Sequence, residues 1–332
     1  MPPIDALPAA AATLQQIADT ERGERAARAS AGAQVMRAVA LAAAGDAGAP
    51  FALRRAQVSV AGLARSAEAS LLRRMVAVGQ ADASAEKLAA PLLAYACELE
   101  RTHRLPEADA AITLALAMAA EDAGTSLHAG RIARKLGQRE RALGLFRQAR
   151  TLDAAAGEIA RIAAVGEAVV SADAERALGA AVRAALRAGD GETAAVGLEE
   201  RAKVRRSAGD RAGAARDLCT AAARYPDAVD RARVAHELAG LALAAGDPAA
   251  AREALVAALA WGDAPQQDHA RSRLHTLARD LGDQVGMRRW RDHKRPALVS
   301  LSAYRPRPAE RSRADRVTRW RQWVDARTAA TA

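Results

Sequence analysis

The sequence predicts an all-α protein, a right-handed α-solenoid built from helix–turn–helix repeats. Three observations support this fold class. Alanine, the residue with the highest intrinsic helix propensity, dominates an apolar fraction of 51%. A pattern of small and apolar residues recurs along the chain. No segment shows the alternating or β-branched pattern that is typical of strands.

The composition favours many thin helical layers over one aromatic-rich core. The chain has 332 residues but only 4 Trp, 3 Tyr and 2 Phe. Alanine lets helices pack closely but buries little area per residue, so many contacts between helices are needed. Asparagine is absent and most of the 49 basic residues are arginine, which is typical of a GC-rich, bacterial-type genome. The excess of arginine is therefore weak evidence for phosphate binding.

Four segments share one pattern, in which a turn is followed by a small residue, an apolar residue four positions later and an alanine three positions after that. They are HRLPEADAAITLA (Ala108, Ile112, Ala115), GQRERALGLFRQA (Gly137, Ala142, Phe146, Ala149), GDRAGAARDLCTA (Gly209, Ala214, Leu218, Ala221) and GDPAAAREALVAA (Gly246, Ala251, Leu255, Ala258). The first small residues are separated by 34, 72 and 37 positions, and 72 is twice 36. We expect a degenerate unit around Ala177, Ala181 and Ala184 to fill the gap, and a further weak unit to begin at Gly282–Asp283.

The spacing has a direct physical interpretation. Positions four and then three residues apart lie on one face of a helix, so each trio forms a packing stripe. The turn glycine ends the preceding helix where positive φ is tolerated. Another helix of about a dozen residues precedes each turn, as in SLHAGRIARKL. Two such helices cannot bury their apolar faces alone and must stack on neighbouring pairs.

This arrangement resembles the tetratricopeptide repeat family. The matching residues are the turn glycines, the small–large–small run of the second helix, Pro226 at the end of one repeat, and the small residues of the first helix, Ala96, Gly130, Ala202 and Ala239. The large aromatic residues usual in the first helix are missing. The resemblance covers about residues 89–295 and implies that the first helix of each repeat lines a concave binding surface.

Three regions are expected. They are an N-terminal helical region of divergent repeats or a cap (1–88), the repeat array (89–295), and a proline-containing linker followed by a basic, tryptophan-containing helix (296–332). Within the first region, helices are expected at about 9–21, 24–44 and 51–78, with a short one from Ser84.

No residue pattern predicts an enzyme. The sequence lacks a phosphate-binding loop and a nucleophile elbow, and the six histidines are scattered, so we predict no catalytic residue, metal or cofactor. Only His269 and His275 come close, at a spacing that does not place them on one helix face. Cys97 and Cys219 are expected to be buried free thiols in a reducing compartment. Without a signal-peptide pattern or a long apolar stretch, we expect a cytoplasmic protein.

The first candidate binding surface is the concave face that the resemblance implies. It would carry Arg131, Arg134, Lys135, Lys203, Arg206, Arg233, His236 and His269. Such a basic surface would suit an acidic peptide or protein partner, because guanidinium groups pair with carboxylates. Alternatively, these are ordinary solvated residues of an arginine-rich chain. Some family members bind an acidic C-terminus through asparagines, and this chain has none.

The second candidate surface is the tail. Residues 284–332 carry 13 Lys or Arg against 4 Asp or Glu, a net charge of +9 out of +10 for the chain. The predicted helix near its end carries Arg311, Arg313, Arg316, Arg319, Trp320, Arg321 and Trp323. It could cap the last repeat, dock on an acidic protein or an anionic membrane surface, or bind nucleic acid by phosphate contacts and stacking. The sequence therefore predicts a scaffold or adaptor protein, with a nucleic-acid-associated or regulatory protein as the alternative.

Enlarging the small residue at the start of a packing stripe tests the repeat alignment. Ala142→Leu and Ala214→Leu should each lower the free energy of unfolding by about 1–3 kcal/mol, because the added atoms have no room between two closely packed helices. Thermal unfolding followed by circular dichroism measures the effect. Melting temperatures equal to wild type in both variants would contradict the alignment.

Overall fold

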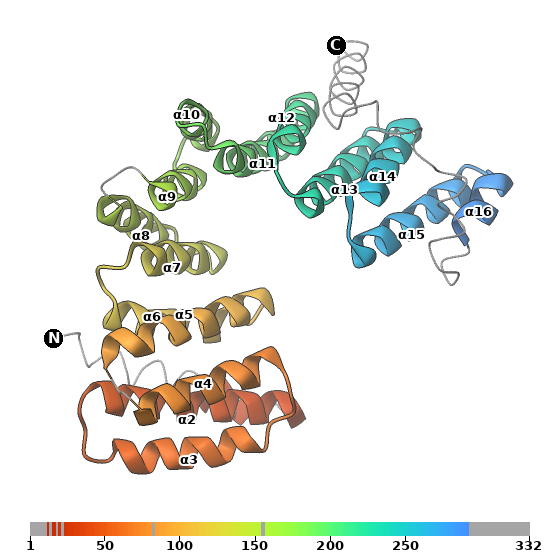
Figure 1. Ribbon diagram of the computed structural model, residues 1–332. Helices are drawn as coiled ribbons and strands as arrows, with labels where there is room; N and C mark the ends of the chain where they lie inside the picture. The colour runs from red at the N-terminus through yellow and green to blue at the C-terminus, as the bar shows by residue number, and fades with distance from the viewer. Residues whose placement is uncertain are drawn as a thin grey trace. The chain divides into compact units, whose positions relative to one another are not determined.

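The computed structural model describes residues 23–81, 84–153 and 157–291, together with a few positions between 12 and 20. Every regular element in these ranges is an α-helix, and within each unit successive helices pack against each other (Figure 1). The predicted fold class, an all-α array of helix–turn–helix pairs, is confirmed. The tail residues from Arg311 to Trp323 lie outside the described residues.

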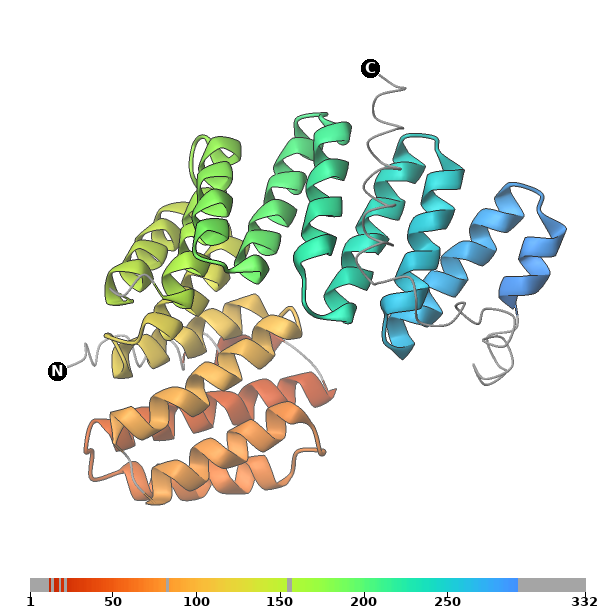
Figure 2. The same ribbon diagram turned by 45° about the horizontal axis from the view of Figure 1, so that its top comes forward.

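The chain divides into two units, Met1–Val170 and Ser171–Ala332. Unit 1 contains α2 (Gly23–Ala43), α3 (Ala49–Ala61), α4 (Ala67–Ala81), α5 (Ala85–Arg101), α6 (Leu105–Met118), α7 (Ala123–Lys135), α8 (Arg139–Leu152) and α9 (Glu158–Val169). Unit 2 contains α10 (Ala174–Arg187), α11 (Gly191–Ser207), α12 (Arg211–Arg224), α13 (Ala228–Ala244), α14 (Pro248–Trp261), α15 (Ala264–Asp280) and α16 (Gln284–Arg291). The closest pairs are α5 with α6, α7 with α8, α11 with α12 and α13 with α14, and each pair runs side by side in Figure 2.

The four predicted packing stripes are buried. On α6, α8, α12 and α14 their members are at most 1% exposed: Ala108, Ile112, Ala115, Ala142, Phe146, Ala149, Ala214, Leu218, Ala221, Ala251, Leu255 and Ala258. The matching alanines of the first helices, Ala96, Ala202 and Ala239, are buried as well. The spacing of four and three residues therefore identifies the faces along which paired helices meet.

Three local predictions were wrong. The short helix expected from Ser84 is the 17-residue α5. The range 51–78 is not one helix but α3 and α4, because the chain turns at Gly62 and the Ser66 hydroxyl accepts a hydrogen bond from the Ala69 amide (3.1 Å), which starts a new helix. In the degenerate unit, Ala184 is exposed. The buried stripe of α10 is shifted by one residue to Leu178, Val182 and Ala185. Helix α10 begins unit 2 and packs against α11, so it turns a different face inward.

The dipeptide Gly–Asp ends one helix and starts the next. Gly209 has φ +87°, a conformation that glycine tolerates, and the Asp210 amide donates to the Arg205 carbonyl at 2.9 Å. The Asp210 carboxylate then accepts from the Gly213 amide at 2.7 Å and caps α12. The same combination occurs at Gly189–Asp190, Gly246–Asp247 and Gly282–Asp283. It fixes a short turn between consecutive antiparallel helices.

An arginine just after the turn connects successive helix pairs. Arg139, at the start of α8, donates from Nε to the Val170 carbonyl at the end of α9, at 2.7 Å. Arg211, at the start of α12, donates from Nη1 to the Ala244 carbonyl at the end of α13, at 3.1 Å. Both bonds satisfy a carbonyl that the last turn of a helix leaves free, at the end where positive charge is favoured.

The tightest helix contact in unit 1 is centred on Phe146 of α8. Its ring is fully buried. A Cβ atom at Gly130 of α7 would lie 2.7 Å from ring carbons of Phe146, and one at Gly166 of α9 would lie 2.6 Å from the ring. Three helices can therefore meet around this ring only because two of them present a glycine to it.

A pair of glycine substitutions tests this packing. Gly130→Ala should lower the free energy of unfolding by about 1–3 kcal/mol, because the fully buried ring cannot move away from the new methyl group. Gly144→Ala on α8 is the matched control, because its Cβ would meet no atom within 4 Å. It should raise stability by up to about 1 kcal/mol through helix propensity. Denaturant unfolding distinguishes the two, and equal effects would contradict the proposed contact.

Candidate functional site

Unit 2 brings five of the eight predicted binding residues onto the first helices of consecutive pairs. Residues three, four and seven apart on a helix share one face, and on α11, α13 and α15 that face is partly open to solvent. We call it the first-helix face of unit 2. It consists of Glu199, Lys203, Arg206, Arg233, His236, Glu237, Gln266, His269 and Arg273. An ion pair joins α11 to α13, and a ring contact joins α13 to α15.

The buried carboxylate of Glu199 is the centre of the α11–α13 contact. The Glu199 side chain is 6% exposed. It pairs with Arg233 and accepts a hydrogen bond from the Tyr225 hydroxyl at 2.8 Å, and the Lys203 ammonium lies 3.7 Å away. The Arg233 guanidinium also lies over the Tyr225 ring, 5.6 Å from its centroid. Burial opposes ionisation, but the hydrogen bond and charge of Arg233 prevail and hold the pKa of Glu199 below its usual range.

On the same face, the pKa of a second glutamate, Glu237, is shifted in the opposite direction. Burial, and then the negative charge of Glu199, raise the pKa of Glu237, although Lys203, Arg233 and Arg206 lower it in part. Glu237 therefore lies in a pair of neighbouring carboxylates that share basic partners. These carboxylates hold the Lys203 and Arg233 side chains in place, and the two basic side chains cover the carboxylates from solvent.

His236 and His269 meet where α13 contacts α15. Their ring centroids are 4.8 Å apart in an edge-to-face arrangement. His236 Nε2 lies 3.3 Å from the Gln266 carbonyl oxygen. Burial, followed by the nearby His269, lowers the pKa of His236. In the sequence, the histidine nearest to His269 is His275. The contact between His269 and His236 arises only because α13 packs on α15.

The three remaining predicted residues lie on α7 in unit 1. Arg131 and Lys135 both pair with Glu100 of α5, at 3.2 and 2.9 Å, and Arg134 lies in the last turn of the same helix. Glu100 is itself buried. The basic residues of this region therefore also lie over a buried carboxylate, which the sequence-based interpretation did not anticipate.

Cys97 of α5 lies beside His128 of α7, with Sγ 3.6 Å from Nδ1. Burial and the charge of Glu100 raise the pKa of the Cys97 thiol, while burial and Arg131 lower the pKa of His128. Both groups are therefore neutral at pH 7, and the pair has the character of a structural contact. Cys97 is only half-buried, in contrast to the expectation, whereas Cys219 is buried, and neither thiol forms a disulfide.

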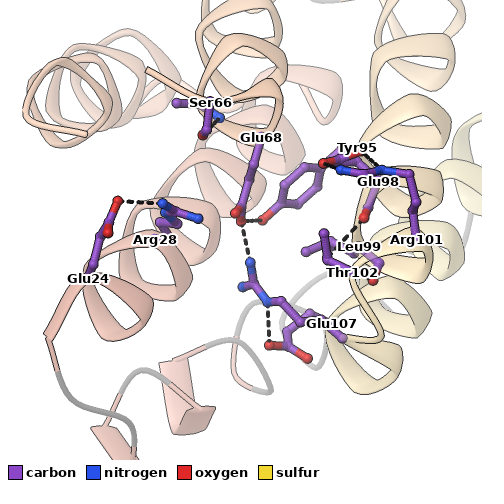
Figure 3. Close-up of polar contacts among 12 residues, drawn as sticks. Glu24, Arg28, Ser66, Glu68, Tyr95, Glu98, Leu99, Arg101, Thr102 and Glu107 are labelled. Atoms are coloured by element: carbon purple, nitrogen blue, oxygen red, sulfur yellow. Dashed lines mark hydrogen bonds and ion pairs between the residues drawn. The ribbon is translucent and has the colours of Figure 1, made fainter. Parts of the chain in front are cut away.

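A fully buried charge cluster was missed by sequence reasoning. Arg104 pairs with Glu68 of α4 at 2.6 Å and with Glu107 of α6 at 3.0 Å, and the Tyr95 hydroxyl lies 3.4 Å from Glu68. Figure 3 shows Glu68, Tyr95 and Glu107 converging from three helices. Burial and the Glu68 charge raise the pKa of Tyr95, which remains a neutral hydrogen-bond donor.

The sequence did contain a signal for these buried acids. Glu68, Leu72 and Met75 have the spacing of four and three residues that marks a buried stripe, and so do Ala195, Glu199 and Ala202. A glutamate within such a stripe predicts a buried carboxylate with a basic partner on the adjacent helix. The identity of that partner depends on packing between segments about 30 residues apart.

The described part of the basic C-terminal region belongs to the fold. Helix α16 buries Trp290, which joins the apolar cluster of unit 2 that includes Leu274 and Leu277. The predicted tail residues beyond it are outside the described residues.

Within the described ranges, no three metal-ligating side chains are grouped as a metal site would require, and none of the helices described is long and apolar enough to span a bilayer. No protein-family model matches the chain, and a search of curated proteins finds no matching relative.

Replacing Glu199 tests whether it organises this face. Glu199→Gln should lower the free energy of unfolding by about 1–3 kcal/mol, less than for a fully buried pair, because Arg233 is 41% exposed. The wild type should lose the same contribution as the pH falls below about 4.3, since the lowered pKa of Glu199 makes its charge stabilising only above that range. The variant should lack this acid dependence.

Glu175→Gln is the matched control, because the Glu175 side chain is 48% exposed and its pair with Arg205 is solvated. It should cost less than about 1 kcal/mol. Equal losses in the two variants, measured by urea unfolding across pH, would show that Glu199 has no special role.

Proposed function

We propose that the chain is a non-enzymatic adaptor that binds an acidic segment of a partner protein on the first-helix face of unit 2. The observation that carries this proposal is the difference in exposure between Glu199 and its two basic partners. The Lys203 and Arg233 side chains are each 41% exposed, whereas Glu199 between them is 6% exposed. A ligand that approaches this face meets basic groups first.

The basic groups differ in their freedom to bind a ligand. The Arg233 guanidinium donates hydrogen bonds to Glu199 and Asp230, so its role is to hold the neighbouring side chains of the face in place. Arg206 is exposed and has no hydrogen bond or ion pair among the contacts described, so its planar fork is available for a carboxylate. His269 is exposed at the far edge of the same face. An extended acidic segment could contact these groups in succession without breaking the Glu199–Arg233 pair.

The energetics favour an extended ligand over a single acidic group. Each solvated ion pair contributes only about 0.2–1 kcal/mol, so useful affinity requires several contacts along a segment. A stacked array of helices is suited to binding an extended segment, because it presents equivalent side chains at regular intervals. Binding of this kind should weaken with salt, since exposed charges are screened over about 8 Å at physiological ionic strength.

A nucleic-acid-associated or regulatory function is the alternative, and the net charge of +9 in residues 284–332 favours it. An anionic membrane surface would be attracted by the same charge. The two free cysteines are consistent with our further proposal of a reducing, cytoplasmic compartment.

Charge reversal on the face tests the proposal. A chain carrying both Lys203→Glu and Arg206→Glu should lose at least tenfold in affinity for an acidic peptide, through lost attraction and new repulsion. Fluorescence anisotropy with a labelled peptide rich in Asp and Glu measures this, with the Asn and Gln version of the peptide as the ligand control. Arg216→Glu with Arg252→Glu is the protein control, because both residues are exposed on second helices.

Equal weakening by the two double variants would show that only net charge matters and would contradict the site. The alternative function is tested by affinity capture from native lysate with the full chain and with a chain ending at Arg295. Loss of nucleic acid or lipid on truncation, with no protein partner retained, would favour the tail as the functional surface.

A further inference from the structure

The contact between α13 and α15 contains a histidine at its centre. His236 Nε2 faces the Gln266 carbonyl oxygen at 3.3 Å, and its ring meets that of His269. Two further bonds flank it: Arg273 Nη1 donates to the His236 carbonyl at 3.2 Å, and Gln266 Nε2 donates to the Val229 carbonyl at 3.1 Å. The imidazole therefore lies within the polar part of this helix–helix contact.

The hydrogen bonds indicate which form of the imidazole the contact accepts. Because Nε2 faces a carbonyl oxygen, it carries the hydrogen, and the neutral ring has its lone pair at Nδ1. Nδ1 of His236 is buried and has no hydrogen-bond partner. Protonation would place a charged N–H there, out of reach of both water and an acceptor, which is a costly arrangement for a buried donor.

The charged and titratable groups around the ring also disfavour protonation of His236. From α15, His269 and Arg273 face it and oppose a positive charge, and burial is the largest effect on its pKa. On α13 itself the nearest ionic groups are Arg233 and Glu237, and Arg233 is paired with Glu199 of α11. From α12, Tyr225 faces Arg233, and α14 contributes Ala257 and Ala258 to the apolar cluster beside Ala235. On α15, Asp268 is adjacent to His269 in sequence, and its carboxylate is paired with Arg271 at 2.7 Å.

We propose that the contact between α13 and α15 is a pH-sensitive joint, closed while His236 is neutral and released when mild acid protonates His236. A histidine whose pKa is lowered by folding stabilises the folded contact above its unfolded pKa of about 6.5. That contribution decreases as the pH falls below this value, because the separated helices bind the proton more readily. Release would separate His269 from His236 and so alter the first-helix face.

Hydrogen exchange on the full chain, compared at pH 7.5 and 5.5 after correction for intrinsic rates, tests the joint. We expect exchange in the first turns of α15, within 264–270, to become severalfold faster at pH 5.5, while α11 and α12 stay unchanged. His236→Gln retains a donor at the position of Nε2 but cannot be charged, so the pH response should be lost. His275→Gln, elsewhere on α15, is the matched control and should keep the full response.

His269→Gln provides an independent variant in case His236→Gln does not fold, since His269 is exposed and its replacement should reduce the response. Equal exchange of α15 at both pH values in the wild type would overturn the proposal. So would a uniform increase over all of unit 2, or an unchanged response in both histidine variants. None of these results depends on the identity of a partner, so the test is separate from that of the proposed function.

Discussion

Where paired helices cross, alanine and glycine leave only a methyl group or a hydrogen atom between the two backbones. The stripes of α6, α8, α12 and α14 all begin with a buried alanine, and the Phe146 ring fits only because Gly130 and Gly166 lack a side chain. Dispersion contacts at this distance replace the large apolar area that the sequence lacks. The side-by-side packing of each pair depends on this close approach.

The same thin layers bring acidic residues into the interior. Glu68, Glu107 and Glu199 are buried, and each has a basic partner: Arg104 at the start of α6 for Glu68 and Glu107, and Arg233 of α13 for Glu199. In unit 1 the partner Arg104 is buried with them, whereas in unit 2 Arg233 is partly exposed. A charge pair that stabilises the fold thereby also places cationic groups on the surface of unit 2. The proposed binding face is in this sense a consequence of how buried carboxylates are neutralised.

Local features of the fold could be predicted from the sequence because their cause is local. Gly209 and Asp210 determine a turn through their own backbone and side chain, and Ala214, Leu218 and Ala221 share a face by helical geometry alone. The shifted stripe of α10 and the pairing of Glu199 with Arg233 could not be predicted, because both depend on the packing of one helix on another. The meeting of His236 with His269 has the same origin, since a single sequence does not specify the rotation of two helices relative to each other.

The arginine that follows a turn has a consequence for how the array comes apart. Arg139 of α8 and Arg211 of α12 each bond to the end of the helix that follows, so a pair that opened alone would leave an unsatisfied carbonyl on that helix. In a stacked array, stability is the sum of the intrinsic stability of each pair and the coupling between adjacent pairs. Stronger coupling suppresses states with a single open pair. Neighbouring pairs that are joined in this way should therefore melt together as one cooperative block.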